Sequence, residues 1–434
     1  MKTKIQQKTI SFLDKIHQWL FQQPLSKEML SFINNLSWSF FGGIISAAII
    51  FIVNIIAGRI LGPDQYGQYS LVIALSAIFV ILMTWGLDTA IVFYVARNNI
   101  STVKKQYRGN VLLLYGILSF SVVIFLYLIK TKLILWFKAP SIVIYWAIIF
   151  ALFYSLKNIA DAFIKSAHQF RFQSFLRILE AIVILLTFGL FVFFTNFNNF
   201  SNYLTVILFG GLVFVLATFI YFRKKIIFSW KYTQPLLSYG SFAIVGAFSG
   251  ILLNSFDKIL INQYLGSYQL GIYNAYFTVS VALITQLIAM FINVFFPVLS
   301  SLSNKEVIFY KINKVFFILF LPLFIIISLI ISLAISLFGQ QYPFDFYLIL
   351  EFSFLSTLII YFTILWWLVA SQGKKGIKFT SINGIIAGLL FIVLNILFSQ
   401  HLNLHLVVFF FAMSIGYAIL VGIVGYKFSW WKLK

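Results

Sequence analysis

LGPDQYGQY at residues 61–69 is repeated 204 positions later as LGSYQLGIY at residues 265–273, with Leu, Gly, Gln, Gly and Tyr at identical spacing. Each copy follows the first long apolar run in its half of the chain, a shared position that chance does not easily produce. Six apolar runs separate the copies, an even number, so both halves have the same orientation. Such parallel repeats are typical of membrane transporters with a site between two lobes. We expect structural roles for the glycines of both copies: Gly62, Gly67, Gly266 and Gly271.

The composition supports a membrane protein and excludes several other classes. The 434 residues are 62% hydrophobic and only 9% charged, and they include no cysteine. A soluble domain carries about a quarter charged residues, so a water-soluble enzyme is excluded, as are disordered and disulfide-stapled chains. The net charge of +21 comes from Lys and Arg residues that lie between apolar runs, so we expect no nucleic-acid partner.

The apolar runs predict an all-α polytopic protein with about twelve transmembrane helices in two six-helix bundles. The expected spans are 36–58, 69–94, 111–129, 142–164, 175–195, 203–222, 236–256, 270–296, 315–338, 346–370, 379–399 and 403–426. The expected organisation is an N-terminal segment (1–35), a first bundle (36–222), a basic linker (223–235), a second bundle (236–426) and a short basic tail (427–434).

The distribution of basic residues predicts the orientation. One side of the expected membrane holds 25 of the 31 Lys and Arg residues, in segments 1–35, 97–108, 165–177, 223–231, 305–314, 374–378 and 427–434. The other side holds Arg59, Lys130, Lys132, Lys138 and Lys258, and Lys157 lies within a span. By the positive-inside rule both termini are cytoplasmic. Residues 1–35 fit two interpretations: an amphipathic helix on the inner membrane surface, or a loosely ordered basic tail.

Four motifs resemble one family. AGRILGPDQYGQYSLV (57–72), WGLDTAIVFYVAR (85–97), DKILINQYLGSYQLGIYNAY (257–276) and FINVFFPVLSSL (291–302) are similar to Wzx-type polysaccharide repeat-unit flippases. This family belongs to the multidrug/oligosaccharidyl-lipid/polysaccharide (MOP) exporter superfamily. The resemblance covers most of residues 35–310 and is weak over the last four spans.

The resemblance implies a V-shaped fold in which spans 1, 2, 7 and 8 line a central cavity. It also implies that the protein moves an undecaprenyl-pyrophosphate-linked oligosaccharide across the bacterial cytoplasmic membrane by alternating access. A polysaccharide polymerase and chain-length machinery would be partners, besides membrane lipids. Related lipid II flippases carry an Arg before the corresponding loop, which matches Arg59, whereas the equivalent position in the second half is Gln263.

Charges inside the expected spans or at their ends are the candidate site residues, because a charge in the bilayer is costly and should face a cavity or a partner. Arg59 follows the first span, and Asp257 and Lys258 close the seventh span at the outer surface. The candidate cations for a pyrophosphate are Arg59, Lys157 and Lys258. The candidate charge-compensating or ion-coupling acids are Asp88, Asp161, Glu180, Asp257 and Glu351. In the alternative, structural interpretation, Lys157 pairs with Asp161 four residues on, and charges at span ends reach water.

No other cofactor is expected beyond a coupling proton or sodium ion. His401 and His405 are four apart, but no acid or cysteine lies nearby in the sequence, so we predict no metal site. No phosphate-binding loop for ATP is present. The alternatives on the same fold are a lipid II flippase and a cation-coupled multidrug exporter. A membrane glycan polymerase or ligase is disfavoured by the short external loops.

Overall fold

The computed structural model describes residues 27–301 and 306–427, which form helices and no strand. The first half consists of α2 (Lys27–Thr84), α3 (Leu87–Arg97), α4 (Ser101–Leu128), α5 (Lys130–Phe137), α6 (Ser141–Ser166), α7 (Phe170–Phe194) and α8 (Phe200–Phe222). A 3₁₀ turn, η1 (Arg223–Lys225), leads to the second half. The amphipathic helix considered within residues 1–35, and the tail after residue 427, lie largely outside the described residues.

The second half repeats this arrangement. It consists of α9 (Thr233–Asn254), α10 (Phe256–Phe277), the π-helical turn η2 (Thr278–Ala282), α11 (Leu283–Ser301), α12 (Glu306–Phe338), α13 (Phe346–Ala370), α14 (Lys374–Leu397), the 3₁₀ turn η3 (Ser399–His401) and α15 (Leu404–Lys427). Of its last four long helices, α13 matches the expected span residue for residue, whereas α12 begins at Glu306 rather than residue 315 and α14 begins at Lys374 rather than residue 379.

The chain reverses at one glycine in each copy of the repeated motif. Gly62 has φ 72° and Gly266 has φ 88°, the left-handed region that glycine adopts without steric cost. The Tyr66 hydroxyl donates a hydrogen bond to Asn54 Oδ1 (3.0 Å) although the residues are 12 apart, a separation of about 18 Å in a straight helix. The expected spans 36–58 and 69–94 leave residues 59–68 as a loop. That expectation is wrong, because helix continues on both sides of a single turn residue.

These reversals reconcile the helices with the expected number of spans. Ten apolar helical stretches of the described chain are long enough to cross a membrane. Two of them, Gly42–Thr84 and Thr233–Ile292, contain the turns at Gly62 and Gly266. Each of these two therefore supplies two spans, so the described residues form twelve spans, as the sequence predicts.

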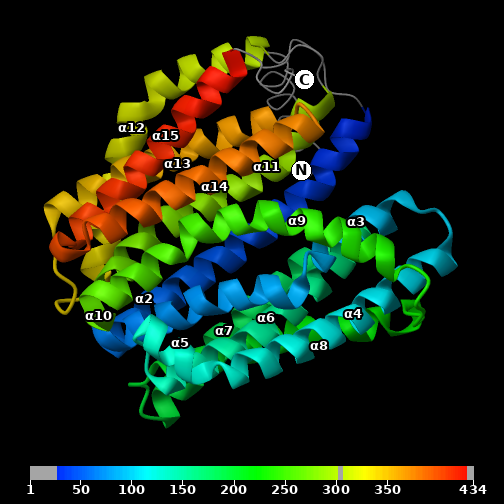
Figure 1. Cartoon of the computed structure of the whole chain (residues 1–434), viewed down its shortest axis with the longest axis horizontal. Coiled ribbons are helices and arrows are strands. Elements are labelled where there is room, and N and C mark those ends of the chain that lie inside the picture. The colour runs from blue at the N-terminus through cyan, green and yellow to red at the C-terminus, as the bar shows by residue number, and fades with distance from the viewer. Residues whose placement is uncertain (1–26, 302–305, 428–434) are drawn as a thin grey trace, which may run out of the picture.

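The two halves meet at one end of the molecule. We call the end that holds Gly62 and Gly266 the motif end, and the opposite end, where most Lys and Arg residues lie, the basic end. In Figure 1 the helices α11–α15 and the first-half helices approach each other toward the left, where α2 and α10 lie, and spread apart toward the right. One continuous apolar core joins both halves, including Tyr66 from α2 and Tyr273 from α10. The fold is thus two lobes joined at the motif end.

Candidate functional site

The two copies of the motif pack directly against each other at the motif end. A Cβ atom added to Gly67 would lie 1.9 Å from the carbonyl oxygen of Ser267, and one added to Gly271 would lie 1.8 Å from that of Pro63. The two contacts are equivalent, because the repeat offset maps Pro63 onto Ser267 and Gly67 onto Gly271. Both motif copies therefore form one pseudo-symmetric junction in which only glycine allows the backbones to approach so closely.

Polar and aromatic contacts extend this junction. The Asp64 carboxylate accepts a hydrogen bond from the Ser267 hydroxyl across the two halves. The Tyr342 hydroxyl, from the turn between α12 and α13, donates to the Gly58 carbonyl oxygen (2.7 Å). The fully buried ring of Tyr66 packs against Phe338 and Tyr342. The motif end is consequently closed in this structure.

A cleft of about 520 Å³ lies in the half of the molecule nearer the basic end, among α3, α6 and α9. Its polar lining includes Asp88, Asn158, Asp161 and Lys165, and its aromatic lining is Phe93 and Tyr239, whose rings stack with centroids 4.6 Å apart. Since Tyr239 belongs to α9, residues from both halves of the chain line the cleft. Carboxylates, an amide, an ammonium group and aromatic faces suit a ligand with hydroxyl groups and charge.

A break in the second span places Asp88 in this cleft. Trp85 and Gly86 both have positive φ (46° and 67°), so α2 ends at Thr84 and α3 begins at Leu87, which places Asp88 in the first turn of α3. The Trp85 indole N–H donates to the Ser241 hydroxyl of α9 (2.9 Å), which ties the break to the second half. The predicted span 69–94 has no interruption, so the sequence did not predict this break, nor that Tyr239 lines the cleft.

The alternative interpretation in which Lys157 pairs with Asp161 is wrong. Lys157 on α6 forms an ion pair with Glu180 on α7, and 21% of the Lys157 side chain is exposed against 6% for Glu180. Asp161 pairs instead with Lys165 (2.7 Å), lies 3.7 Å from Arg177 and accepts a hydrogen bond from Gln173 (2.5 Å). The rotation of α7 against α6 decides these partners, and the sequence does not reveal it.

Asp257 and Lys258 also lie elsewhere than expected. The seventh span continues beyond residue 256 to the turn at Gly266, so the pair is inside the span and buried rather than at its surface. The Lys258 ammonium group lies 3.2 Å from Asp257, donates to the Asn254 carbonyl oxygen (2.8 Å) and lies 3.7 Å from the centroid of the Phe277 ring. Asp257 accepts a further hydrogen bond from Tyr273 (2.8 Å). Here the two charges neutralise each other.

Arg59 differs from the other two candidate cations. It is exposed at the motif end, and a Cβ atom on Gly339 would lie 3.4 Å from its Nε atom. No hydrogen bond or ion pair joins its guanidinium group to another described residue. Of the three candidate cations, Arg59 alone remains uncompensated within the described chain.

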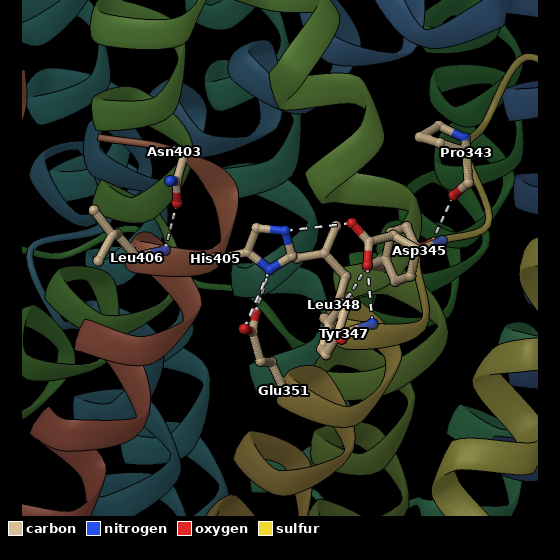
Figure 2. Close-up of polar contacts among 9 residues, drawn as sticks. Pro343, Asp345, Tyr347, Leu348, Glu351, Asn403, His405 and Leu406 are labelled. Carbon is tan, nitrogen blue, oxygen red and sulfur yellow. Dashed lines mark hydrogen bonds and ion pairs between the residues drawn. The ribbon is translucent and has the colours of Figure 1, made fainter. Parts of the chain in front are cut away.

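Glu351 lies in a cluster that the sequence reading did not foresee. Figure 2 shows the His405 ring between Glu351 and Asp345: Nδ1 lies 3.0 Å from Glu351 and Nε2 lies 3.3 Å from Asp345. The expectation that no acid approaches His405 is therefore wrong, since α13 and α15 pack side by side although about 50 residues separate them. Within the described residues, no group of three or more His, Asp or Glu is arranged to hold a metal ion.

Comparison with known proteins agrees with this architecture. Residues 32–303 match the model of a family described as "Polysaccharide biosynthesis protein". A search among curated protein sequences found no match.

Several solved transporters share the fold at low sequence identity. An inward-facing MATE multidrug resistance transporter of the MOP superfamily has a TM-score of 0.69 and 15% identity, covering 90% of this chain and 97% of its own. The outward-facing form of a MATE transporter has a TM-score of 0.63 and 15% identity, covering 92% and 96%. A MOP-superfamily transporter from Pyrococcus furiosus, described as having a binding pocket of reverse polarity, has a TM-score of 0.59 and 15% identity, covering 92% and 96%.

The family match covers more than half of the chain and includes both copies of the motif. The solved structures share the two-lobed fold over nearly its whole length. The chain is therefore a multi-pass membrane protein that belongs to the polysaccharide biosynthesis protein family and has the fold of MATE transporters.

Proposed function

We propose that this protein is a flippase that moves an undecaprenyl-pyrophosphate-linked oligosaccharide from the inner to the outer leaflet of a bacterial cytoplasmic membrane. The observation that carries the proposal is the family match over residues 32–303 in a chain with a transporter fold. The product would be consumed outside the membrane by a polysaccharide polymerase and its chain-length machinery. The basic end would face the cytoplasm, in accord with the positive-inside rule.

The geometry suits loading from the basic end. The motif end is closed by the Gly67 and Gly271 contacts, whereas the cleft lies toward the opposite end and is lined by both halves of the chain. The glycan would occupy this cleft, with sugar hydroxyls on Asp88 and Asn158 and apolar sugar faces near Tyr239. Rocking of one lobe against the other would then open the motif end, which is the general route of alternating access.

One observation favours a second candidate, an exporter of cationic small molecules. The cleft contains two carboxylates, Asp88 and Asp161, and the described residues place no salt bridge on Asp88. Asp161 is paired with Lys165 and lies 3.7 Å from Arg177, whereas Asp88 forms no ion pair with a described residue, so Asp88 is the carboxylate available to a cation. A substrate comparison separates the two functions.

Reconstitution provides that comparison. Proteoliposomes would contain undecaprenyl-pyrophosphate-linked glycan extracted from the native host, and an impermeant glycosidase would report transfer between leaflets. The flippase proposal predicts that the protein makes the glycan in the inner leaflet accessible. Transport of a lipophilic cation such as ethidium without glycan transfer would replace the proposal with the exporter.

Arg59 supplies a prediction for the exit of the substrate. Arg59→Ala is expected to abolish glycan export, whereas Arg59→Lys retains part of it, because a lysine keeps the charge but loses bidentate phosphate contacts. Export is measured as surface polysaccharide in a strain that carries each variant at equal protein level. Lys132→Ala, which removes another exposed cation near the motif end, is the matched control and should export normally. Normal export by Arg59→Ala would remove Arg59 from the mechanism.

A further inference from the structure

The cluster of Asp345, Glu351 and His405 has a proton requirement that follows from its geometry. Both imidazole nitrogens of His405 face carboxylate oxygens, Nδ1 at 3.0 and 3.2 Å from Glu351 and Nε2 at 3.3 Å from Asp345. A neutral imidazole has one N–H donor and one lone pair, so one carboxylate would then face a lone pair. The observed arrangement is satisfied only when an additional proton resides on the cluster.

Among the described residues, His405 is the one basic side chain that pairs with Asp345 and Glu351. No Lys or Arg of the described chain forms an ion pair with Asp345 or Glu351. Asp345 caps the N-terminus of α13. Its Oδ1 atom accepts hydrogen bonds from the backbone N–H groups of Tyr347 (2.9 Å) and Leu348 (3.2 Å). Its Oδ2 atom is the one that faces His405. Roughly a third of each side chain is exposed, so protons can exchange with water.

The same cluster anchors the turn that touches the first half of the chain. This turn, residues 339–345, reaches Gly58 through the hydrogen bond from Tyr342. The Tyr276 hydroxyl of α10 donates to the Pro343 carbonyl oxygen (2.7 Å) and accepts from the Asp345 backbone N–H (2.9 Å). Asp345 therefore ends the turn that contacts the first half, and its side chain also contacts the His405 imidazole, as Figure 2 shows.

We propose that Asp345, Glu351 and His405 form a proton-binding latch for the motif end. A proton shared by His405 and the two carboxylates holds the 339–345 turn in the position that contacts the first half. Loss of that proton places a lone pair against a carboxylate, weakens the anchor and favours an open motif end. Imidazole is the side chain that changes charge between pH 5 and 8, so acidity on the motif-end side would favour closure. The inference rests on the proposed function only in that transport requires this end to open.

Labelling of the purified full chain tests the latch without any substrate. The sequence has no cysteine, so Leu135→Cys on α5 and Leu397→Cys on α14 would carry the only thiols. Both positions lie near the motif end, on different halves, and are exposed (75% and 71%). Spin labels at these sites in lipid nanodiscs report the distance between the halves. The short-distance fraction is expected to rise several-fold from pH 8 to pH 5.

Two variants with opposite expectations sharpen the test. His405→Gln removes the imidazole that bridges the two carboxylates, so the motif end should be more open at every pH, with no response to pH. Glu351→Gln allows a neutral imidazole to donate to Asp345 and to accept from the new amide, so the motif end should stay closed even at pH 8. His401→Gln, in η3 just before α15, is the matched control and should respond as the unmodified chain does.

The outcomes are separable from the transported substrate. An unmodified chain whose distances do not change between pH 8 and pH 5 would overturn the latch, as would a His405→Gln variant that keeps the full response. A pH response that Glu351→Gln leaves intact would move the proton to another group. None of these results depends on whether the protein carries a glycan, so failure of the flippase proposal would leave the latch standing.

Discussion

Gly271→Ala is expected to abolish glycan export. The added methyl group would lie 1.8 Å from the Pro63 carbonyl oxygen, which is backbone and cannot rotate aside, so α2 and α10 must separate. Overpacking of this kind costs about 2–3 kcal/mol, which changes a two-state population by roughly 30- to 150-fold. The closed motif end would become a minor state, and the cycle would stall.

The repeat provides a second variant with the same expectation. Gly67→Ala meets the Ser267 carbonyl oxygen at 1.9 Å in the pseudo-equivalent contact and should have a similar effect. Gly416→Ala on α15, where an added methyl group meets no atom within 4 Å, is the control and should export normally. Surface polysaccharide and the label distance at the motif end are the two readouts. Normal export with an unchanged distance in Gly271→Ala would show that the junction does not need this contact.

Lys157→Met is expected to destabilise the protein strongly. The substitution leaves the buried Glu180 carboxylate without its partner, and breaking a buried ion pair in this way costs about 3–5 kcal/mol. Because a fifth of the Lys157 side chain is exposed, we expect the lower end of that range. The measurement is the Tm of the purified protein in detergent, together with export at equal protein level.

The double variant Lys157→Met/Glu180→Gln separates structure from substrate binding. With no charge left unpaired, both Tm and export should recover, because neutral residues of similar size replace the pair. Recovery would assign Lys157 to the packing of α6 against α7 rather than to the pyrophosphate. A stable double variant that still fails to export would return Lys157 to the substrate pathway.

The spans and the repeat could be predicted because the bilayer imposes them. A helix must stay apolar for about 20 residues to cross lipid, and this length is visible in the sequence. The repeat Leu61–Tyr69 and Leu265–Tyr273 correctly indicated two similar halves. It did not reveal that each copy contains a one-residue reversal, since a Gly-containing polar stretch also fits an ordinary loop.

The partners of the charged residues could not be predicted, because they depend on how helices rotate against one another. Local spacing favoured Asp161 for Lys157, but packing brought Glu180 closer. The sequence does not indicate that Asp345 and Glu351 lie beside His405, because His405 is on a helix two positions later in the chain. Asp257 and Lys258 were placed at a span end because they are charged, whereas a neutral pair can be buried within the span.

Whether the protein transfers a lipid-linked glycan across the membrane is decided by the leaflet in which that glycan lies in a strain that lacks the protein. Lipid-linked glycans would be extracted after treatment of spheroplasts with an impermeant glycosidase, and identified by mass. We expect single undecaprenyl-linked repeat units to accumulate and to be protected from the enzyme. Accumulated units that the glycosidase removes would contradict this expectation, because they would have crossed the membrane without this protein.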